Sequence, residues 1–283
     1  MTQQKLDPPG RLTDLLRPEV LTSFDRETFE REGYWVWENV LTDEGRHRWT
    51  ASLEKLQQMN DEIVMDTDWE AIDPQMMDLF SKVLGERFFY DHMLMLNRPA
   101  GSEGRRWHGH PYRQGQHEVE DPVGTGEFVT KEFLHQQCVR TLCYPEGATI
   151  EDGCEFAVIP GAHLYRIPFK WSTQRPDYDD DMETNWLKGK THAFTGEPLK
   201  IRRLSIPPGS MVSFVHHLPH HVGHRKAGTD MRWGLLMAYR TPDPTAEPAK
   251  WNESAPIYWC ERTEAAGNLS PTAQRLFEGD NPI

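Results

Sequence analysis

The chain has few cysteines and no long apolar run. Only 4 of its 283 residues are cysteine, and no two of them form a C-x-x-C pair. This usage is typical of reduced thiols in a cytoplasmic protein. The first residues, MTQQKLDPPG, lack the apolar stretch of a signal peptide, and no later run approaches the length of a membrane span. We therefore expect a cytoplasmic protein.

The chain also lacks an excess of positive charge. It carries 31 Lys and Arg against 44 Asp and Glu, a net charge of -13. Nucleic acid and anionic membrane surfaces are therefore poor partners, although a local basic pocket for a small anion is allowed. The 37% of hydrophobic residues and 10 Trp are typical of a soluble enzyme with a sizeable core. A homo-oligomer is compatible with this composition.

Glycine-rich phosphate loops and alternating β-α units are missing as well, which argues against a doubly wound sheet. Helical patterns come first, followed by many short apolar segments separated by turns. This order predicts an α+β, mainly β chain built around an antiparallel sandwich or barrel, with N-terminal helices packed on the outer sheet. The expected organisation is an arm at 1–22 and one domain at 23–283, with a core at about 86–240, an insertion or lid at about 166–198 and a tail at 241–283.

Local signals predict the individual elements. Glycines, N-caps and apolar periodicity indicate helices, and short apolar runs indicate strands. The expected helices cover Asp25–Glu32, about 42–60 with Thr42 as N-cap, and about 74–84. The expected strands are Tyr34–Trp37, Phe88–Leu96, Phe133–Tyr144, Cys154–Ile159, Leu199–Leu204, Gly209–Val215 and Arg232–Tyr239.

Histidines cluster in one stretch, HHLPHHVGHRKAGTDMR, which runs from His216 to Arg232. Five histidines fall within nine residues, and Arg232 opens an apolar run. A histidine cluster at the end of a strand, with a basic residue on the next strand, is a candidate site for a metal and an acid. A histidine-rich surface turn would give the same cluster, so the remaining ligands must come from elsewhere in the chain.

His108 and His110 are the candidate local pair. Non-haem iron is often held by two histidines and one carboxylate on one face, which leaves positions open for a co-substrate and oxygen. On an extended segment, residues two apart point the same way. The third ligand would then come from the cluster at 216–224. A loop histidine that makes only a hydrogen bond is the competing interpretation for His108.

Several motifs in this order resemble the phytanoyl-CoA dioxygenase family. They are Tyr34-Trp35-Val36 after an amphipathic helix, Trp107-His108, the segment DGCEFAVIPGAH at 152–163, and His221 followed by Arg232. The resemblance covers roughly residues 25–240. It implies an Fe(II)- and 2-oxoglutarate-dependent oxygenase with a double-stranded β-helix, the cupin-like jelly roll.

The resemblance also implies roles for single residues. The first iron ligand of the family falls on His108. Its distal histidine precedes the 2-oxoglutarate arginine by about eleven residues, which selects His221 over His220 when the arginine is Arg232. A guanidinium suits the distal carboxylate of 2-oxoglutarate because it is planar, permanently charged and bidentate. His220 and the other histidines of the cluster then become supporting or surface residues.

One departure from the family pattern is the tripeptide His108-Gly109-His110, where the family has His-x-Asp or His-x-Glu. His110 is either a ligand of a three-histidine centre, which is the reading we favour, or it points away and leaves an open position, as in related halogenases. A third alternative is a carboxylate from the next loop. The acidic residues there are Glu118, Glu120 and Asp121.

The same resemblance suggests further pocket residues. Gln136 and Gln137 lie on a strand that lines the co-substrate pocket in the family, and Gln137 is the candidate for a hydrogen bond to 2-oxoglutarate. Trp107 and Tyr112 flank the metal segment and are expected to wall the substrate pocket, although aromatic residues equally suit a core. His163 is expected to be structural.

These observations favour an iron oxygenase that oxidises an unactivated C–H bond of a small-molecule metabolite with O2 and 2-oxoglutarate. Hydroxylation is the default outcome, while desaturation, ring formation and halogenation start from the same step. Two alternatives remain. One is an iron oxygenase with a three-histidine centre that does not use 2-oxoglutarate, and the other is a non-catalytic jelly-roll binding protein.

Overall fold

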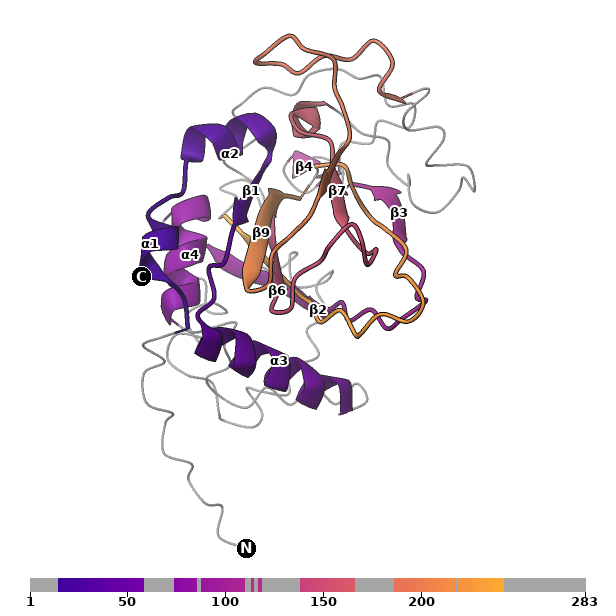
Figure 1. The fold of residues 1–283 in the computed structure, drawn as a ribbon. Helices are drawn as coiled ribbons and strands as arrows, with labels where there is room; N and C mark the ends of the chain where they lie inside the picture. The colour runs from indigo at the N-terminus through magenta and orange to yellow at the C-terminus, as the bar shows by residue number, and fades with distance from the viewer. Residues whose placement is uncertain are drawn as a thin grey trace, which may run out of the picture.

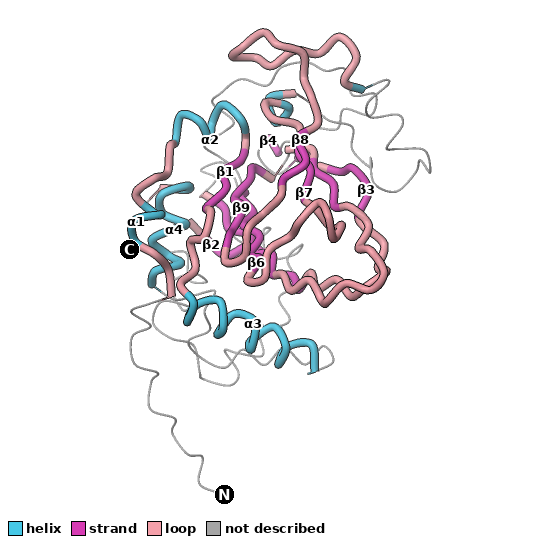
Figure 2. Tube along the Cα trace, in the orientation of Figure 1, coloured by secondary structure: helices cyan, strands magenta, loops and turns pink. Residues whose placement is uncertain are grey.

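Two antiparallel β-sheets face each other in this computed structural model, which describes residues 15–58, 74–85, 88–109, 113–114, 117–118, 138–165, 186–216 and 218–241 (Figures 1 and 2). The larger sheet has five strands in the order β1-β9-β6-β11-β2, and the smaller has four in the order β3-β10-β7-β8. Neighbours in the sheets are far apart in sequence, so the chain passes repeatedly between the sheets.

The bounds of the elements follow from the backbone. The helices are α1 (Pro18–Leu21), α2 (Arg26–Glu32), α3 (Asp43–Gln58) and α4 (Pro74–Leu84), with a 3-10 turn at Ala162–Leu164. The strands are β1 (Tyr34–Trp37), β2 (Phe89–Met95), β3 (Arg105–His108), β4 (Arg113–Gln114), β5 (His117–Glu118), β6 (Cys138–Tyr144), β7 (Phe156–Val158), β8 (Arg202–Leu204), β9 (Ser210–Val215), β10 (His220–Val222) and β11 (Leu235–Arg240).

The space between the sheets is filled by inward-facing side chains. Successive residues of a strand point to opposite faces, so every second residue of each strand turns inward. These residues form one buried cluster, in which Leu142 and Tyr144 of β6 meet Phe156 of β7 and Phe214 of β9. Register places Arg140 of β6 opposite Phe214, so Arg140 lies on this inner face too.

The outer face of the five-stranded sheet is covered by the helices. Figure 1 shows α1, α2 and α4 grouped beside this sheet, and α3 lies across one end. Trp49 of α3 and Phe80 of α4 share one buried cluster with Met237 and Tyr239 of β11. Within the sheet, Ser213 accepts a hydrogen bond from Trp37 Nε1 (2.9 Å) and lies 2.8 Å from Thr141 Oγ1. These contacts join three neighbouring strands.

A third cluster covers the outer face of the four-stranded sheet. It contains Trp107, Ala157 and Ile159 from the sheet side and Trp186 and Leu199 from the segment that follows residue 185. The polar composition of 166–198 predicted an insertion or lid. In its described part, Trp186 instead packs on the sheet.

Most expected elements are present. Helices and strands start and end within a few residues of their predicted bounds, and Thr42 caps α3 by accepting a hydrogen bond from Gly45 N (2.9 Å). The strand expected at 133–144 begins at Cys138 among the described residues, and positions 133–137 lie outside them. None of the helices in the described ranges has the length and apolar character that a membrane span requires.

Candidate active site between the sheets

His108 ends β3 with its side chain buried between the sheets. It is 5% exposed, and its Nδ1 lies 2.8 Å from the carbonyl oxygen of Arg106. A carbonyl can only accept, so Nδ1 carries the proton and the lone pair lies on Nε2. Burial, followed by the charge of Arg105, lowers the pKa of His108 to about 3, with a smaller contribution from Arg140. The imidazole is therefore neutral at pH 7, the form that binds metal ions.

His220, the first residue of β10, contacts His108. The two residues are direct partners in the antiparallel register, and their ring centroids are 4.0 Å apart. His220 is 3% exposed and packs against Phe156 and Phe214 of the inner cluster. Its Nδ1 donates to the carbonyl oxygen of Leu218 (2.7 Å), so the lone pair of this ring also lies on Nε2.

His221 lies on the other face of the same strand. Its ring stacks on Trp107 at a centroid distance of 5.4 Å, next to the outer cluster. The spacing to Arg232 predicted His221 as the partner of His108, whereas the ring that contacts His108 is that of His220. Consecutive residues of a strand point in opposite directions, so only one of this pair can face the interior. Trp107, expected in the substrate pocket, is packed in the outer cluster.

The two inner histidines have the hydrogen-bonding pattern of metal-ligating imidazoles. A ligating histidine usually donates its other ring N–H to a carbonyl or carboxylate, which fixes the tautomer and the orientation of the ring. Both His108 and His220 do this through Nδ1. No group of three or more His, Cys, Asp or Glu side chains arranged for a metal ion is found within the described ranges. Any third ligand must therefore come from the remaining part of the chain.

Several predicted site residues lie outside the described residues. These are His110, Tyr112, Glu120, Asp121, Gln136 and Gln137, while Glu118 is described only as part of β5. Their predicted roles remain untested by the structure.

Arg232 lies on the same inner side and is 3% exposed. It donates to the carbonyl oxygens of Cys154 (3.3 Å) and Leu96 (2.9 Å), and its guanidinium carbon lies 5.2 Å from the ring centre of Tyr144. Burial raises the pKa of Tyr144 to about 12, so its ring stays neutral. Arg232 is thus a fixed cation in the interior that also contains the two histidines, and within the described residues none of these contacts is with a carboxylate.

Sequence reasoning missed His220 and Arg98. For His220, the alternation of side chains along a strand could have indicated the correct residue. His220 lies on the same face as the apolar Val222, two residues later. Arg98 pairs with Arg232 through an isolated antiparallel bridge between segments 134 residues apart, so only the three-dimensional register brings it to the site.

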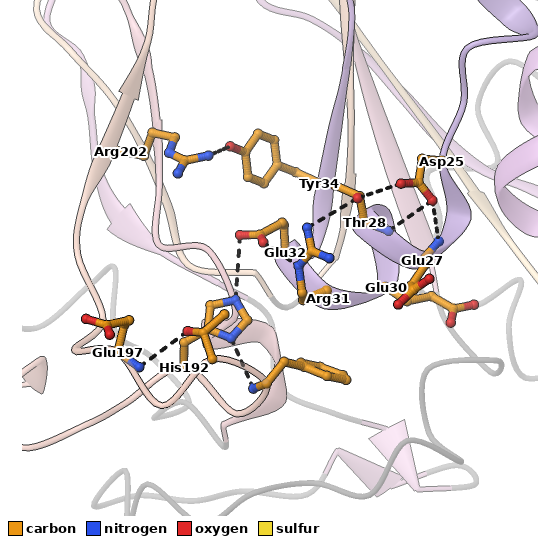
Figure 3. A network of polar contacts seen from close by, with 12 residues as sticks. Asp25, Glu27, Thr28, Glu30, Arg31, Glu32, Tyr34, His192, Glu197 and Arg202 are labelled. Carbon is orange, nitrogen blue, oxygen red and sulfur yellow. Dashed lines mark hydrogen bonds and ion pairs between the residues drawn. The ribbon is translucent and has the colours of Figure 1, made fainter.

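A second polar group lies away from the interior, where α2 meets the segment before β8 (Figure 3). His192 Nε2 lies 3.6 Å from Glu32 Oε2, and Arg202 donates to the hydroxyl of Tyr34 (2.8 Å). Glu32, His192 and Arg202 border a cavity of about 390 Å³ that is also lined by Glu197. The group joins α2 and β1 to the four-stranded sheet, and nothing in it resembles the paired tautomers of the inner histidines.

Solved structures similar to this chain include two non-haem, alpha-ketoglutarate-dependent enzymes and a protein solved with 2-oxoglutarate. The carbocyclase SnoK of nogalamycin biosynthesis has a TM-score of 0.54 at 12% identity, over 79% of this chain and 86% of that one. The epimerase SnoN of the same biosynthesis has 0.53 at 14%, over 80% and 82%. EctD from S. alaskensis, solved with 2-oxoglutarate and 5-hydroxyectoine, has 0.53 at 15%, over 83% and 81%. The chain has the jelly-roll fold.

That result confirms the predicted fold class and goes no further, because identities this low establish only the fold. No family model matches the sequence, and no curated protein matches it either. The resemblance to the phytanoyl-CoA dioxygenase family therefore stays a prediction.

Proposed function

We propose that this protein is a mononuclear Fe(II)- and 2-oxoglutarate-dependent oxygenase that oxidises a C–H bond of a small molecule. The observation that carries the proposal is the pair of buried imidazoles, His108 and His220, each locked by a carbonyl so that Nε2 presents its lone pair. The similarity to SnoN, which was solved with Fe3+, alpha-ketoglutarate and a nogalamycin compound, supports the same chemistry.

Each inner residue then has a defined task. Iron(II), when bound, supplies the redox chemistry that couples decarboxylation of 2-oxoglutarate to substrate oxidation. His108 and His220 hold the metal as neutral donors. Arg232, kept in place by two carbonyls, binds the carboxylate of 2-oxoglutarate that is farther from the metal. The Phe156 and Phe214 rings around His220 exclude water from the reaction.

The substrate class is inferred from the inner face of β2 and β6. Leu94 lies opposite the buried Leu236, so it points inward, yet it is 46% exposed. An apolar side chain that is exposed on an inner face marks open space beside it. The buried Arg140 lies on the same face and acts electrostatically on His108. We infer a substrate with an apolar skeleton and a polar or anionic group, which is also consistent with a small-molecule metabolite.

The decisive experiment compares the two adjacent histidines. His220→Ala is expected to weaken Fe(II) or Mn(II) binding by more than about 100-fold, because it removes a direct ligand. His221→Ala is the matched control and is expected to keep metal affinity near that of the wild type, because its ring faces Trp107. Metal affinity is measured by calorimetry under anaerobic conditions. A loss confined to His221→Ala would restore the prediction from spacing and reject His220.

The third ligand is tested in the same way. We keep His110 as the proposed ligand, since it follows His108, the last residue of β3, by two positions, and residues two apart on an extended chain point the same way. His110→Ala should weaken metal binding, while His110→Asp should retain it, because a carboxylate also suits a facial iron site. Wild-type affinity in His110→Ala would reject His110 as a ligand and leave an open position or a carboxylate from the following loop.

Turnover separates the remaining alternatives. Iron-loaded protein is expected to convert 2-oxoglutarate to succinate, and a wider screen of apolar acids identifies compounds that accelerate this conversion. Stoichiometric iron without succinate formation would favour an oxygenase that does not use 2-oxoglutarate. Failure to bind any metal would leave a jelly-roll binding protein.

A further inference from the structure

We propose that Arg98 is a second guanidinium of the co-substrate site and binds the distal carboxylate of 2-oxoglutarate together with Arg232. The inference rests on the proposed function, and it adds a residue that neither the sequence motifs nor the spacing to His221 indicates.

The backbone holds the two arginines side by side. Arg98 N donates to Arg232 O, and Arg232 N donates to Arg98 O, both at 2.9 Å. Two residues that exchange both backbone hydrogen bonds in an antiparallel pair lie directly opposite each other, with their side chains on the same face. The positions of Arg98 and Arg232 are therefore fixed by the ends of β2 and β11, not by flexible side chains.

Both guanidiniums have donor capacity left. Arg232 uses one nitrogen for Cys154 O and another for Leu96 O, while its buried Nε has no hydrogen-bond partner within the described part of the chain. The buried Nε of Arg98 has none there either. A buried donor that is left unpaired costs about 1–3 kcal/mol, so an arrangement with two such donors calls for a bound acceptor.

The charges point to an anion. Two like charges on directly opposite residues destabilise a β pair. Burial, followed by the charge of Arg232, lowers the pKa of Arg98, and the other strongest electrostatic neighbours of Arg98 are Cys154, Arg105 and Tyr144. None of these is a carboxylate. A buried guanidinium and a half-buried one on directly opposite residues are stabilised when an anion lies between them.

A third nearby arginine shows the contrast. Arg225 is 6% exposed and also acts on Cys154, but its donors reach the carbonyl oxygens of Asp230 (2.9 Å) and Gly153 (3.4 Å). Arg225 is thus used to hold the loop before β11. The Nε donors of Arg98 and Arg232, in contrast, have no partner within the described part of the chain and remain available for a ligand.

The ligand that fits is a carboxylate. A carboxylate has two oxygens that each accept more than one hydrogen bond. Arg232 already donates to two carbonyl oxygens, so two guanidiniums together offer the carboxylate more N–H donors than Arg232 alone. The 2-oxo acid end of the co-substrate would bind at the metal that His108 and His220 would hold. The carboxylate at the other end would then reach the arginine pair, so the two arginines select a 2-oxo acid that has a second carboxylate.

The test measures selectivity between two co-substrates. Binding of 2-oxoglutarate and of 2-oxopentanoate, which lacks the distal carboxylate, is measured by calorimetry on Mn(II)-loaded protein without oxygen. Arg98→Met is expected to weaken the binding of 2-oxoglutarate at least about tenfold and to leave the binding of 2-oxopentanoate unchanged. Arg98→Lys keeps the charge without the fork and is expected to lie between Arg98→Met and the wild type.

Two further variants serve as controls with a small and a large expected effect. Arg105→Met removes an exposed positive charge that also acts on Arg98, and it should change the selectivity less than about threefold because the charge is screened by solvent. Arg232→Met should abolish the preference for 2-oxoglutarate. The ratio of the two affinities is used because a general loss of stability lowers both binding constants together.

The outcomes are distinguishable. An unchanged ratio in Arg98→Met, with a lowered ratio in Arg232→Met, overturns the role of Arg98 and leaves the proposed function intact. A wild-type protein that binds metal but prefers neither co-substrate overturns the proposed function itself. If Arg98→Met does not fold, Arg98→Lys decides. An affinity ratio of 2-oxoglutarate to 2-oxopentanoate equal to that of the wild type rejects the role of the Arg98 guanidinium, and a lowered ratio supports it.

Discussion

At the scale of single residues, His163 is a buried histidine outside the proposed metal site. It is fully buried in the Pro-Gly-Ala-His turn, and its Nε2 donates to the carbonyl oxygen of Glu30 (2.9 Å). Burial lowers the pKa of His163 to about 4. The structural role expected for this residue therefore has a physical basis: the neutral ring fixes the turn to α2.

Because His163 is buried as a neutral ring, we expect the free energy of unfolding to fall in mild acid. The unfolded chain takes up a proton on this imidazole near pH 6.5, but the folded chain does so only near pH 4. The contribution of the neutral His163 ring to the free energy of unfolding is therefore complete above about pH 6.5. It falls by up to about 3 kcal/mol as the pH falls towards 4. The free energy of unfolding in urea, measured from pH 7.5 to 4, should fall more steeply for the wild type than for His163→Gln.

The exposed His47 provides the control, since His47→Gln removes an imidazole that is not buried. Its pH profile should follow that of the wild type. Parallel profiles for wild type and His163→Gln would mean that the burial of His163 is not what sets the acid sensitivity.

At the scale of elements, the C-terminal end of α2 is capped by a distant turn. Helix ends leave backbone carbonyls that need donors. Gly161 N donates to Glu32 O (3.0 Å), and His163 donates to Glu30 O. The helix also ends at Gly33, whose φ of +83° is the left-handed conformation that glycine adopts without strain. One turn thus connects the helical layer to the four-stranded sheet.

Gly33 also leaves room for the His163 ring. A Cβ at this position would lie 2.4 Å from His163 Nδ1. Gly33→Ala should therefore lower the free energy of unfolding by about 2–4 kcal/mol, from backbone strain plus the clash. Gly85 has a φ of +87° at the end of α4 with nothing within 4 Å of the same Cβ, so Gly85→Ala should cost only about 1 kcal/mol. Chemical denaturation of both variants measures the difference, and equal losses would contradict a contact with His163.

At the scale of the whole molecule, the proposed ligands connect the two sheets. The inner histidines belong to the four-stranded sheet, and Arg98 and Arg232 flank β2 and β11 of the five-stranded sheet. A metal with 2-oxoglutarate bound to it would cross-link both layers. Because the helices pack on the opposite face of the larger sheet, they stabilise this arrangement without blocking the interior.

Ligand binding should therefore stabilise the protein against heat. A ligand at 100 times its dissociation constant adds about 2.7 kcal/mol to the free energy of unfolding. Mn(II) should raise the melting temperature by a few degrees, and 2-oxoglutarate should raise it further only when Mn(II) is present. Chelation by EDTA should reverse the shift. His220→Ala should show no shift with Mn(II); a full shift in that variant would place the metal elsewhere.

Local patterns were sufficient for most of the helices and strands. Tyr34–Trp37 is an aromatic and β-branched run that begins directly after Gly33 ends a helix, Thr42 is an N-cap, and Gly85 ends a periodic helix, so nearby residues alone decide these elements. The segment at 186–199 could not be assigned in this way, because its largely polar sequence contains one buried aromatic anchor, Trp186. Trp186 finds its partners only on the outer face of a sheet formed by remote strands.

The sequence by itself determined the jelly-roll fold, His108 as a metal ligand candidate and Arg232 as an anion-binding candidate, because motifs of local residues carry these features. The tertiary structure decided which histidine of the pair His220-His221 faces His108, and that Arg98 stands beside Arg232. Both depend on strand register: a shift of one residue moves a side chain to the opposite face of the sheet, and spacing along the chain does not record that choice.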